Sequence, residues 1–137
     1  MILAFELDKH KSLWYAVADR IRVRTAAGMK LEKAEDMKAE ILIGWKLTYN
    51  QYPLRSCYAC KHAVRIEEYI NDGRREGREC QYCPFGRYWC GKNTEYAQLQ
   101  RAVWASNEVG WEPVKKKLKE EAYELALRIA EKEVVRR

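Results

Sequence analysis

Two pairs of cysteines constrain this chain more than any other feature. Two residues separate the members of each pair and nineteen residues separate the pairs, which are Cys57, Cys60, Cys80 and Cys83. A turn with two intervening residues aims both sulfurs at one point, so two such turns can supply four thiolates at tetrahedral corners. This spacing is typical of zinc sites, and thiolate ligands favour zinc over magnesium or calcium. Four thiolates leave no open coordination position, so we expect one structural zinc ion per chain.

Several alternatives to this ligand set stay open. Six residues lie between Cys83 and Cys90, and Cys90 is either a small buried residue beside aromatic side chains or a replacement for one of the four ligands. His62 follows Cys60 closely enough to act as a ligand as well. The cysteines could also be buried or redox-active without a metal, or hold an iron–sulfur centre. His10 is expected to be a surface or capping residue at the start of a helix.

The composition predicts a reduced, single-domain protein. The chain has 137 residues, of which 47% are hydrophobic and 34% charged, and this balance fits one globular domain. It contains no run of about 18 apolar residues, so we expect no membrane span. The short apolar start is followed at once by Glu6 and Asp8, which argues against a secretory signal. We therefore predict a cytoplasmic location, where thiols stay reduced.

The formal charge of +6 is spread along the whole chain. Basic and acidic residues number ten and seven in residues 1–56, seven and five in 57–92, and nine and eight in 93–137. Because no basic arm or tail stands out, the charge permits contact with nucleic acid but does not indicate it.

The apolar periodicity predicts a mostly α-helical fold in three parts. The first part, residues 1–54, is expected to be an antiparallel helical hairpin. Its helices run from about Lys9 to Thr25 and from about Leu31 to Leu47. Asp8 is a plausible N-cap and Gly28 a plausible stop for the first helix. The apolar faces of the two helices are expected to hold Trp14 and Trp45 in the core.

The second and third parts are a zinc-binding module and a pair of C-terminal helices. The module, residues 55–92, has a turn signal at 71–73 that predicts a short β-hairpin or a single helical turn. The third part, residues 93–137, is expected to hold a short helix over 93–105 that buries Trp104. A longer helix over 113–136 follows, with Pro113 suited to its first position. The helices are thus expected to surround a small zinc module with four cysteine ligands.

One arrangement of motifs resembles a known group of proteins. The chain reads Lys-His-Lys-Ser-Leu-Trp at 9–14, Cys-Tyr-Ala-Cys-Lys at 57–61 and Cys-Gln-Tyr-Cys-Pro at 80–84, with Cys90 and Tyr96 beyond. This resembles small zinc-finger-like proteins of unknown function encoded by phages and prophages of Gram-positive bacteria. Those proteins carry a His-x-x-Leu-Trp helix ahead of a Cys-aromatic-x-Cys … Cys-x-x-Cys-Pro … Cys core. The resemblance covers roughly residues 9–100 and implies a phage setting, a host-cytoplasmic location and a shared metal core.

The sequence favours a binding protein over an enzyme. It has no complete G-x-x-x-x-G-K-[ST] motif, since Asn93 follows the G-x-x-x-x-G-K stretch at 86–92, and no G-x-G-x-x-G, H-E-x-x-H or G-x-S-x-G motif. A coordinatively full zinc also leaves no site for a substrate. We therefore expect a non-enzymatic protein that binds a host or phage protein, because tryptophan is enriched at interface hot spots. The candidate partner-binding residues are Trp89, Trp111, Tyr58 and Arg87. The alternative is a nucleic-acid-binding regulatory protein, since aromatic side chains next to Lys or Arg can hold single strands.

Elemental analysis of the purified protein is expected to find about one zinc per chain, as a four-thiolate shell requires. Serine at any one of Cys57, Cys60, Cys80 or Cys83 should lose the metal, whereas Cys90→Ser should keep it. A brown iron chromophore, or loss of zinc in the Cys90→Ser variant alone, would contradict this ligand assignment.

Overall fold

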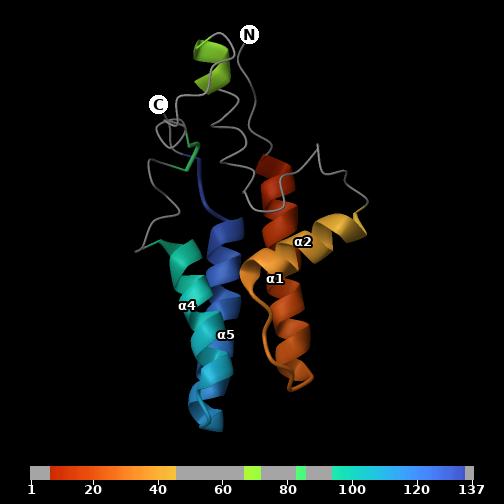
Figure 1. Cartoon of the computed structure of the whole chain (residues 1–137), viewed down its shortest axis with the longest axis vertical. Coiled ribbons are helices and arrows are strands. Elements are labelled where there is room, and N and C mark those ends of the chain that lie inside the picture. The colour runs from red at the N-terminus through yellow and green to blue at the C-terminus, as the bar shows by residue number, and fades with distance from the viewer. Residues whose placement is uncertain (1–6, 46–66, 72–82, 86–93, 135–137) are drawn as a thin grey trace.

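The computed structural model describes residues 7–45, 67–71, 83–85 and 94–134 (Figure 1). These residues form four helices: α1 (Leu7–Ala26), α2 (Ala34–Gly44), α4 (Glu95–Glu108) and α5 (Glu112–Ala130). A single helical turn spans 67–70, and none of the described residues is in a strand. The prediction of a mostly helical protein is therefore confirmed for the described part of the chain. The zinc module lies almost wholly outside it.

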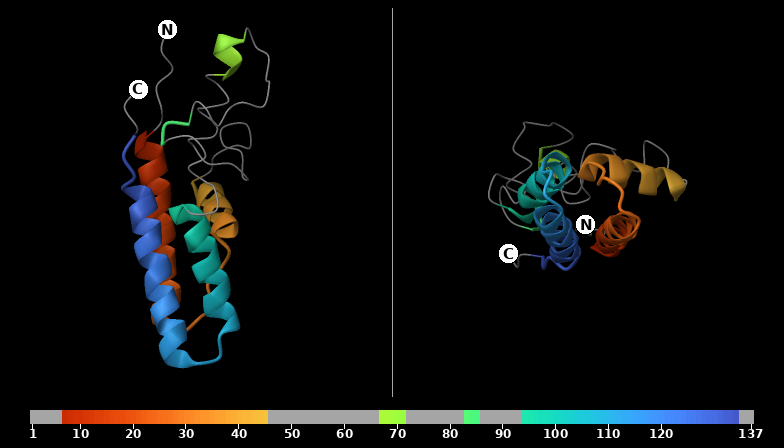
Figure 2. Two further views of the ribbon diagram at one scale, coloured as in Figure 1. Left: turned by 90° about the vertical axis from the view of Figure 1, so that its left-hand side faces the viewer. Right: turned by 90° about the horizontal axis from the view of Figure 1, so that it is seen from below.

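Three long helices form the body of the fold. Helix α5 packs along both α1 and α4, and these are the two most extensive contacts between helices. The chain runs in opposite directions along α1 and α5, and again along α4 and α5 (Figures 1 and 2). Helices from the two ends of the sequence therefore share one hydrophobic core.

Helix α1 forms because apolar residues recur at helical spacing, and its buried face holds Leu13, Trp14, Val17, Ala18 and Ile21. It begins at Leu7, so Asp8 lies in the first turn instead of serving as the N-cap, although its charge still complements the helix dipole there. The predicted stop at Gly28 is confirmed. Gly28 has a φ of 70°, and the backbone bonds from Gly28 N–H to Thr25 and from Met29 N–H to Arg24 form a Schellman ending.

Helix α2 does not form the predicted antiparallel hairpin with α1. It is shorter than expected and runs across α1 instead of back along it (Figures 1 and 2). The partner that lies antiparallel along α1 is α5. The physical reason is that α5 offers α1 a long apolar face, whereas α2 buries few residues: Ala34, Met37, Lys38 and Leu42.

The connection between α1 and α2 is tethered to the other two helices by side-chain hydrogen bonds. The Asn107 side chain of α4 pairs with both backbone groups of Leu31. It accepts from the Leu31 N–H at 3.1 Å and donates to the Leu31 carbonyl at 2.8 Å. Lys119 Nζ of α5 donates to the Met29 carbonyl at 2.8 Å. Because these bonds satisfy backbone groups of an irregular segment, they fix where α2 begins.

Ion pairs hold the same connection to α1. Arg20 pairs with Glu32 at 2.6 Å and also with Glu40 of α2, and Arg24 lies 3.6 Å from Glu32. Each pair is partly exposed, so each contributes only a few tenths of a kcal/mol, but a shared Arg20 correlates the positions of α1, the connection and α2.

Trp14 is the point at which α1, α2 and α4 meet. Its ring is fully buried and makes an edge-to-face contact with Tyr96 of α4, with 5.8 Å between ring centroids. The ammonium of Lys38, from α2, lies 5.7 Å from the centroid of each of these two rings. A cation between two aromatic faces gains electrostatic energy that partly offsets the loss of water, and this helps to retain a lysine that is almost completely buried.

Two expectations for the helices were wrong, and both concern tryptophans. Trp45 and Trp104 are not core residues, since their side chains are 41% and 67% exposed. Helix α4 instead buries Leu99, Ala102, Val103 and Ser106, and Trp104 projects to one side of that stripe. Of the β-hairpin and the single helical turn expected near residues 71–73, the described residues show the helical turn, at 67–70, where the Asn71 N–H bonds back to the Glu67 carbonyl.

His10 is not the surface or capping residue that was expected. It is fully buried, and its Nε2 donates to the Ile129 carbonyl of α5 at 2.9 Å. His10 precedes Trp14 by four residues and so extends the buried face of α1 by one turn. Burial is the main cause that lowers its pKa from 6.5 to about 4. The bond to Ile129 acts in the opposite direction, and the charges of Lys38 and Lys11 lower the pKa further.

This buried imidazole predicts a pH-dependent stability. Between pH 6.5 and about 4 the unfolded chain binds a proton at His10 that the folded chain does not. The free energy of unfolding should therefore fall as the pH falls through this window, by about 3 kcal/mol in total from this group. His10→Gln keeps a side-chain donor for Ile129 but removes the titration. Urea denaturation at a series of pH values should show wild type losing more stability than this variant. Parallel curves for the two proteins would contradict the assignment.

Candidate functional site

Of the four predicted zinc ligands, the structure describes only Cys83. Cys57, Cys60 and Cys80, and the alternatives Cys90 and His62, lie outside the described residues, as do Tyr58, Arg87 and Trp89. Within the part of the chain that the structure describes, no three potential ligands come together. The zinc site therefore stays a prediction that rests on cysteine spacing and thiolate chemistry.

The position of Cys83 shows where one predicted ligand lies relative to the helical body. Its side chain is partly buried and packs against the hydrophobic core, and Phe85, two residues later, is itself a core residue. The Phe85 ring lies 4.6 Å from the His10 ring, centroid to centroid. A turn at 84–85 thus carries the chain from a predicted metal ligand straight into the core of the helical body. Any ion held by Cys83 would lie next to the end of the bundle where α1 begins.

The same contact joins two motifs that are distant in sequence. His10, Leu13 and Trp14 form the His-x-x-Leu-Trp pattern, and all three are fully buried. His10 contacts Phe85, which directly follows the Cys-x-x-Cys-Pro pattern. These motif residues therefore pack residues 83–85, the described piece of the cysteine segment that adjoins the body, against α1, which is a structural role.

Among the predicted partner-binding residues, only Trp111 is described. It occupies the N-cap position of α5 and is 68% exposed. Its backbone carbonyl accepts the first helical hydrogen bond, from Lys115, while the indole projects into solvent. An equally exposed tryptophan, Trp104, was missed because it was assigned to the core. The sequence does indicate this exposure, because Leu99, Val103 and Ser106 form a stripe at helical spacing and Trp104 lies beside it.

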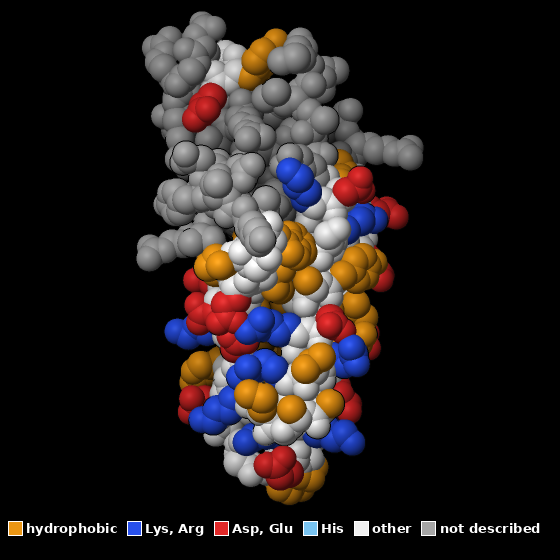
Figure 3. All heavy atoms as spheres, turned by 90° about the vertical axis from the view of Figure 1, so that its right-hand side faces the viewer, with side chains coloured by type: hydrophobic (Ala, Val, Ile, Leu, Met, Phe, Trp, Pro, Cys, Tyr) orange, Lys and Arg blue, Asp and Glu red, His pale blue; other side chains and the backbone are white. Residues whose placement is uncertain are grey.

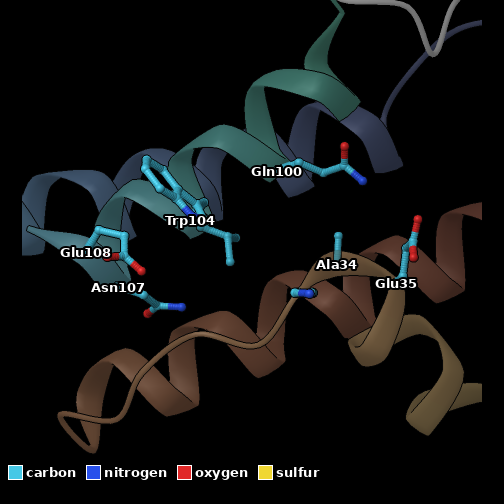
Figure 4. Close-up of a pocket in the computed structure, with 8 residues that line it drawn as sticks. Ala34, Glu35, Gln100, Trp104, Asn107 and Glu108 are labelled. Carbon is cyan, nitrogen blue, oxygen red and sulfur yellow. The ribbon is translucent and has the colours of Figure 1, made fainter.

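Trp104 lines a groove between the start of α2 and the second half of α4. The groove has a volume of about 550 Å³, and its apolar surface comes from Ala34, Val103 and Trp104. Figure 4 shows Ala34 facing the α4 side chains across the gap, with Gln100 toward one end and Asn107 toward the other. The groove lies where α2 crosses the bundle and makes little contact with α4.

The charges at this groove are not matched within the described chain. Glu35 on α2 and Glu108 on α4 both line it and lie toward opposite ends (Figure 4). The described residues offer neither carboxylate an ion-pair partner, and Lys33 is the single basic side chain in the lining. The groove thus presents two carboxylates and one ammonium around an apolar floor.

Elsewhere the described surface mixes both signs of charge. On the side where α1 and α2 face the viewer, basic and acidic side chains alternate with isolated hydrophobic ones (Figure 3). None of the described helices is long and apolar enough to cross a bilayer.

The chain matches no protein-family model, no characterised protein and no solved structure at a significant level of similarity. The resemblance to phage-encoded zinc-finger-like proteins therefore stays a prediction based on the motifs alone.

Proposed function

We propose that this chain is a non-enzymatic protein-binding module, stabilised by one zinc ion, that captures an amphipathic helix of a phage or host protein in the groove between α2 and α4. The observation that carries the proposal is Trp104, which lines this groove while 67% exposed. An aromatic side chain of this size contributes most when a partner covers it, and tryptophan is a frequent hot spot at interfaces.

The shape and chemistry of the groove favour a helix as the occupant. Two helices form its walls, and an amphipathic helix laid into such a groove is a recurring mode of recognition in which a few apolar anchors enter at helical spacing. The small side chain of Ala34 leaves room opposite Trp104 for an apolar side chain of the partner helix. The polar ends, with Gln100 and Asn107, can bond to polar side chains at the rim of the partner helix.

The two carboxylates of the groove favour a partner helix with basic residues. Glu35 and Glu108 lie at opposite ends of the groove (Figure 4), so a helix with a Lys or Arg on each side of its apolar anchors would pair with both. Such rim pairs mainly raise the association rate and fix the orientation of the partner. Nucleic acid, the alternative partner predicted from the sequence, finds less support at this groove, because phosphate backbones are repelled by carboxylates.

The zinc segment supports this function indirectly. Cys57, Cys60, Cys80 and Cys83 would hold the ion, which would tie the segment before Phe85 to the helical body. The ion would supply folding energy only, since four thiolates leave no position for a substrate.

A display library of helix-forming peptides, panned on zinc-loaded protein, tests the groove directly. Selected peptides should share apolar residues at i, i+3 or i+4 and i+7, with Lys or Arg beside them. Trp104→Ala should weaken the best peptide at least about 30-fold, as expected for a hot spot worth about 2 kcal/mol or more. Trp111→Ala is the matched control, because Trp111 is equally exposed but lies outside the groove, and it should change affinity less than about twofold.

The carboxylates give a second readout. Glu35→Gln combined with Glu108→Gln should slow association and reduce its dependence on salt, with little change in the dissociation rate. Circular dichroism should confirm that every variant keeps its helix content. Peptides that lose affinity with Trp111→Ala but not with Trp104→Ala would place the contact surface elsewhere and contradict the proposal.

A further inference from the structure

The end of the bundle where α5 begins carries a concentration of lysines around a small pocket. Four lysines line a cavity of about 270 Å³: Lys30, Lys115, Lys116 and Lys119. Glu112 is the single acidic residue in the lining. Its carboxylate is highly exposed and lies 3.9 Å from Lys115 Nζ. Four ammonium groups and one carboxylate give the lining a net charge of about +3, in a chain whose excess charge is otherwise spread thinly.

The placement of these lysines follows from the local structure. Lys115, Lys116 and Lys119 are at i, i+1 and i+4 of α5, so they share one side of its first two turns. Lys30 comes from the connection after α1, which the Met29 and Leu31 tethers hold against this end of α5. Gly28, which also lines the pocket, has open space where a side chain would be.

Lys119 is unusual because its charge is buried without a counterion among the described residues. The residue is only 7% exposed, and its ammonium donates to the Met29 carbonyl at 2.8 Å. An ammonium has three donors, and no described carboxylate lies within ion-pair distance of this one. Buried charges are normally paired, because desolvation of an uncompensated charge is costly. An anion in the pocket would supply the missing partner.

The first turn of α5 adds to the positive electrostatic potential of the pocket. The helix begins at Glu112, so the positive end of its dipole lies at the pocket and favours a bound anion. Lysines, a buried ammonium and a helix N-terminus thus converge on one cavity from α5 and from the connection after α1.

We propose that this pocket binds a small phosphate-bearing molecule, either inorganic phosphate or a phosphate monoester. Such a group carries about −1.5 to −2 charges near pH 7 and several strong acceptor oxygens, which match clustered ammonium donors. A polyanion fits less well, because acidic and basic residues are equal in number in the lining of the adjacent cavity on α5, which therefore offers a continuing phosphodiester backbone no excess of positive charge. This inference is independent of the α2–α4 groove.

Titration of the full-length, zinc-loaded protein with inorganic phosphate, at constant ionic strength in chloride, tests the proposal. Calorimetry should show saturable binding of one phosphate per chain, and phosphate should raise the melting temperature by linkage. Replacement of Lys30 and Lys116 together by glutamine should weaken phosphate binding about tenfold or more, because two charge-assisted donors are lost. Lys117→Gln is the matched control, since it removes a charge from the same helix turn outside this pocket, and it should change the affinity less than about twofold.

Two further titrations distinguish a phosphate monoester from a nucleic-acid backbone as the ligand. Glycerol phosphate should bind through the same lysines, whereas a single-stranded oligonucleotide without terminal phosphates should bind more weakly and without saturation at one site. Absence of saturable phosphate binding would overturn the proposal, as would an equal loss in Lys117→Gln. Binding of the oligonucleotide alone, sensitive to Lys30 and Lys116, would overturn it as well, because the ligand would then be a nucleic-acid backbone.

Discussion

The burial of Trp14 against Lys38 and Tyr96 is the contact on which the rest of the structure depends. These three side chains come from α1, α2 and α4, so a single cluster sets the relative positions of three helices. The cation is retained in the core because two aromatic faces attract it. The Lys38 ammonium lies between both rings because α2 crosses the bundle. This contact therefore favours the crossed direction of α2. The groove that α2 forms with α4 is a consequence of this crossing.

The same face of α1 continues through His10 to Phe85 and so to the predicted zinc ligand Cys83. The helical body and residues 83–85 thus share a contact between the rings of His10 and Phe85. The two proposed binding regions lie away from it. The groove is assigned to a partner helix and the lysine pocket to a phosphate group. Asn107 lines both, but α5 contributes residues to the lysine pocket alone. A phosphate in the lysine pocket would pair with Lys119, whose bond to Met29 helps to tether the start of α2.

Periodicity predicted the existence of the four described helices well, because local apolar spacing decides helix formation. It predicted the stop at Gly28, where the positive φ demanded by a Schellman ending suits glycine. The direction of α2 could not be predicted, since it depends on tertiary contacts of Lys38 and Asn107 with residues far away in sequence. His10, Lys38 and Lys119 were not recognised as buried because polar residue types are usually exposed. The exposure of Trp104 was misjudged, because its neighbour Val103 is the residue that occupies the buried stripe.

The helical body has its own core, and we propose that the cysteine segment beside it is stabilised separately by zinc. Hydrogen exchange measured with and without a zinc chelator tests it most directly. We expect chelation to remove protection from residues 55–91 first. Amides of α1, α4 and α5 should stay protected, because Trp14, Leu125 and Ile129 keep their buried contacts. A uniform loss of protection across all helices on chelation would contradict it, because the zinc segment and the helical body would then unfold as one cooperative unit.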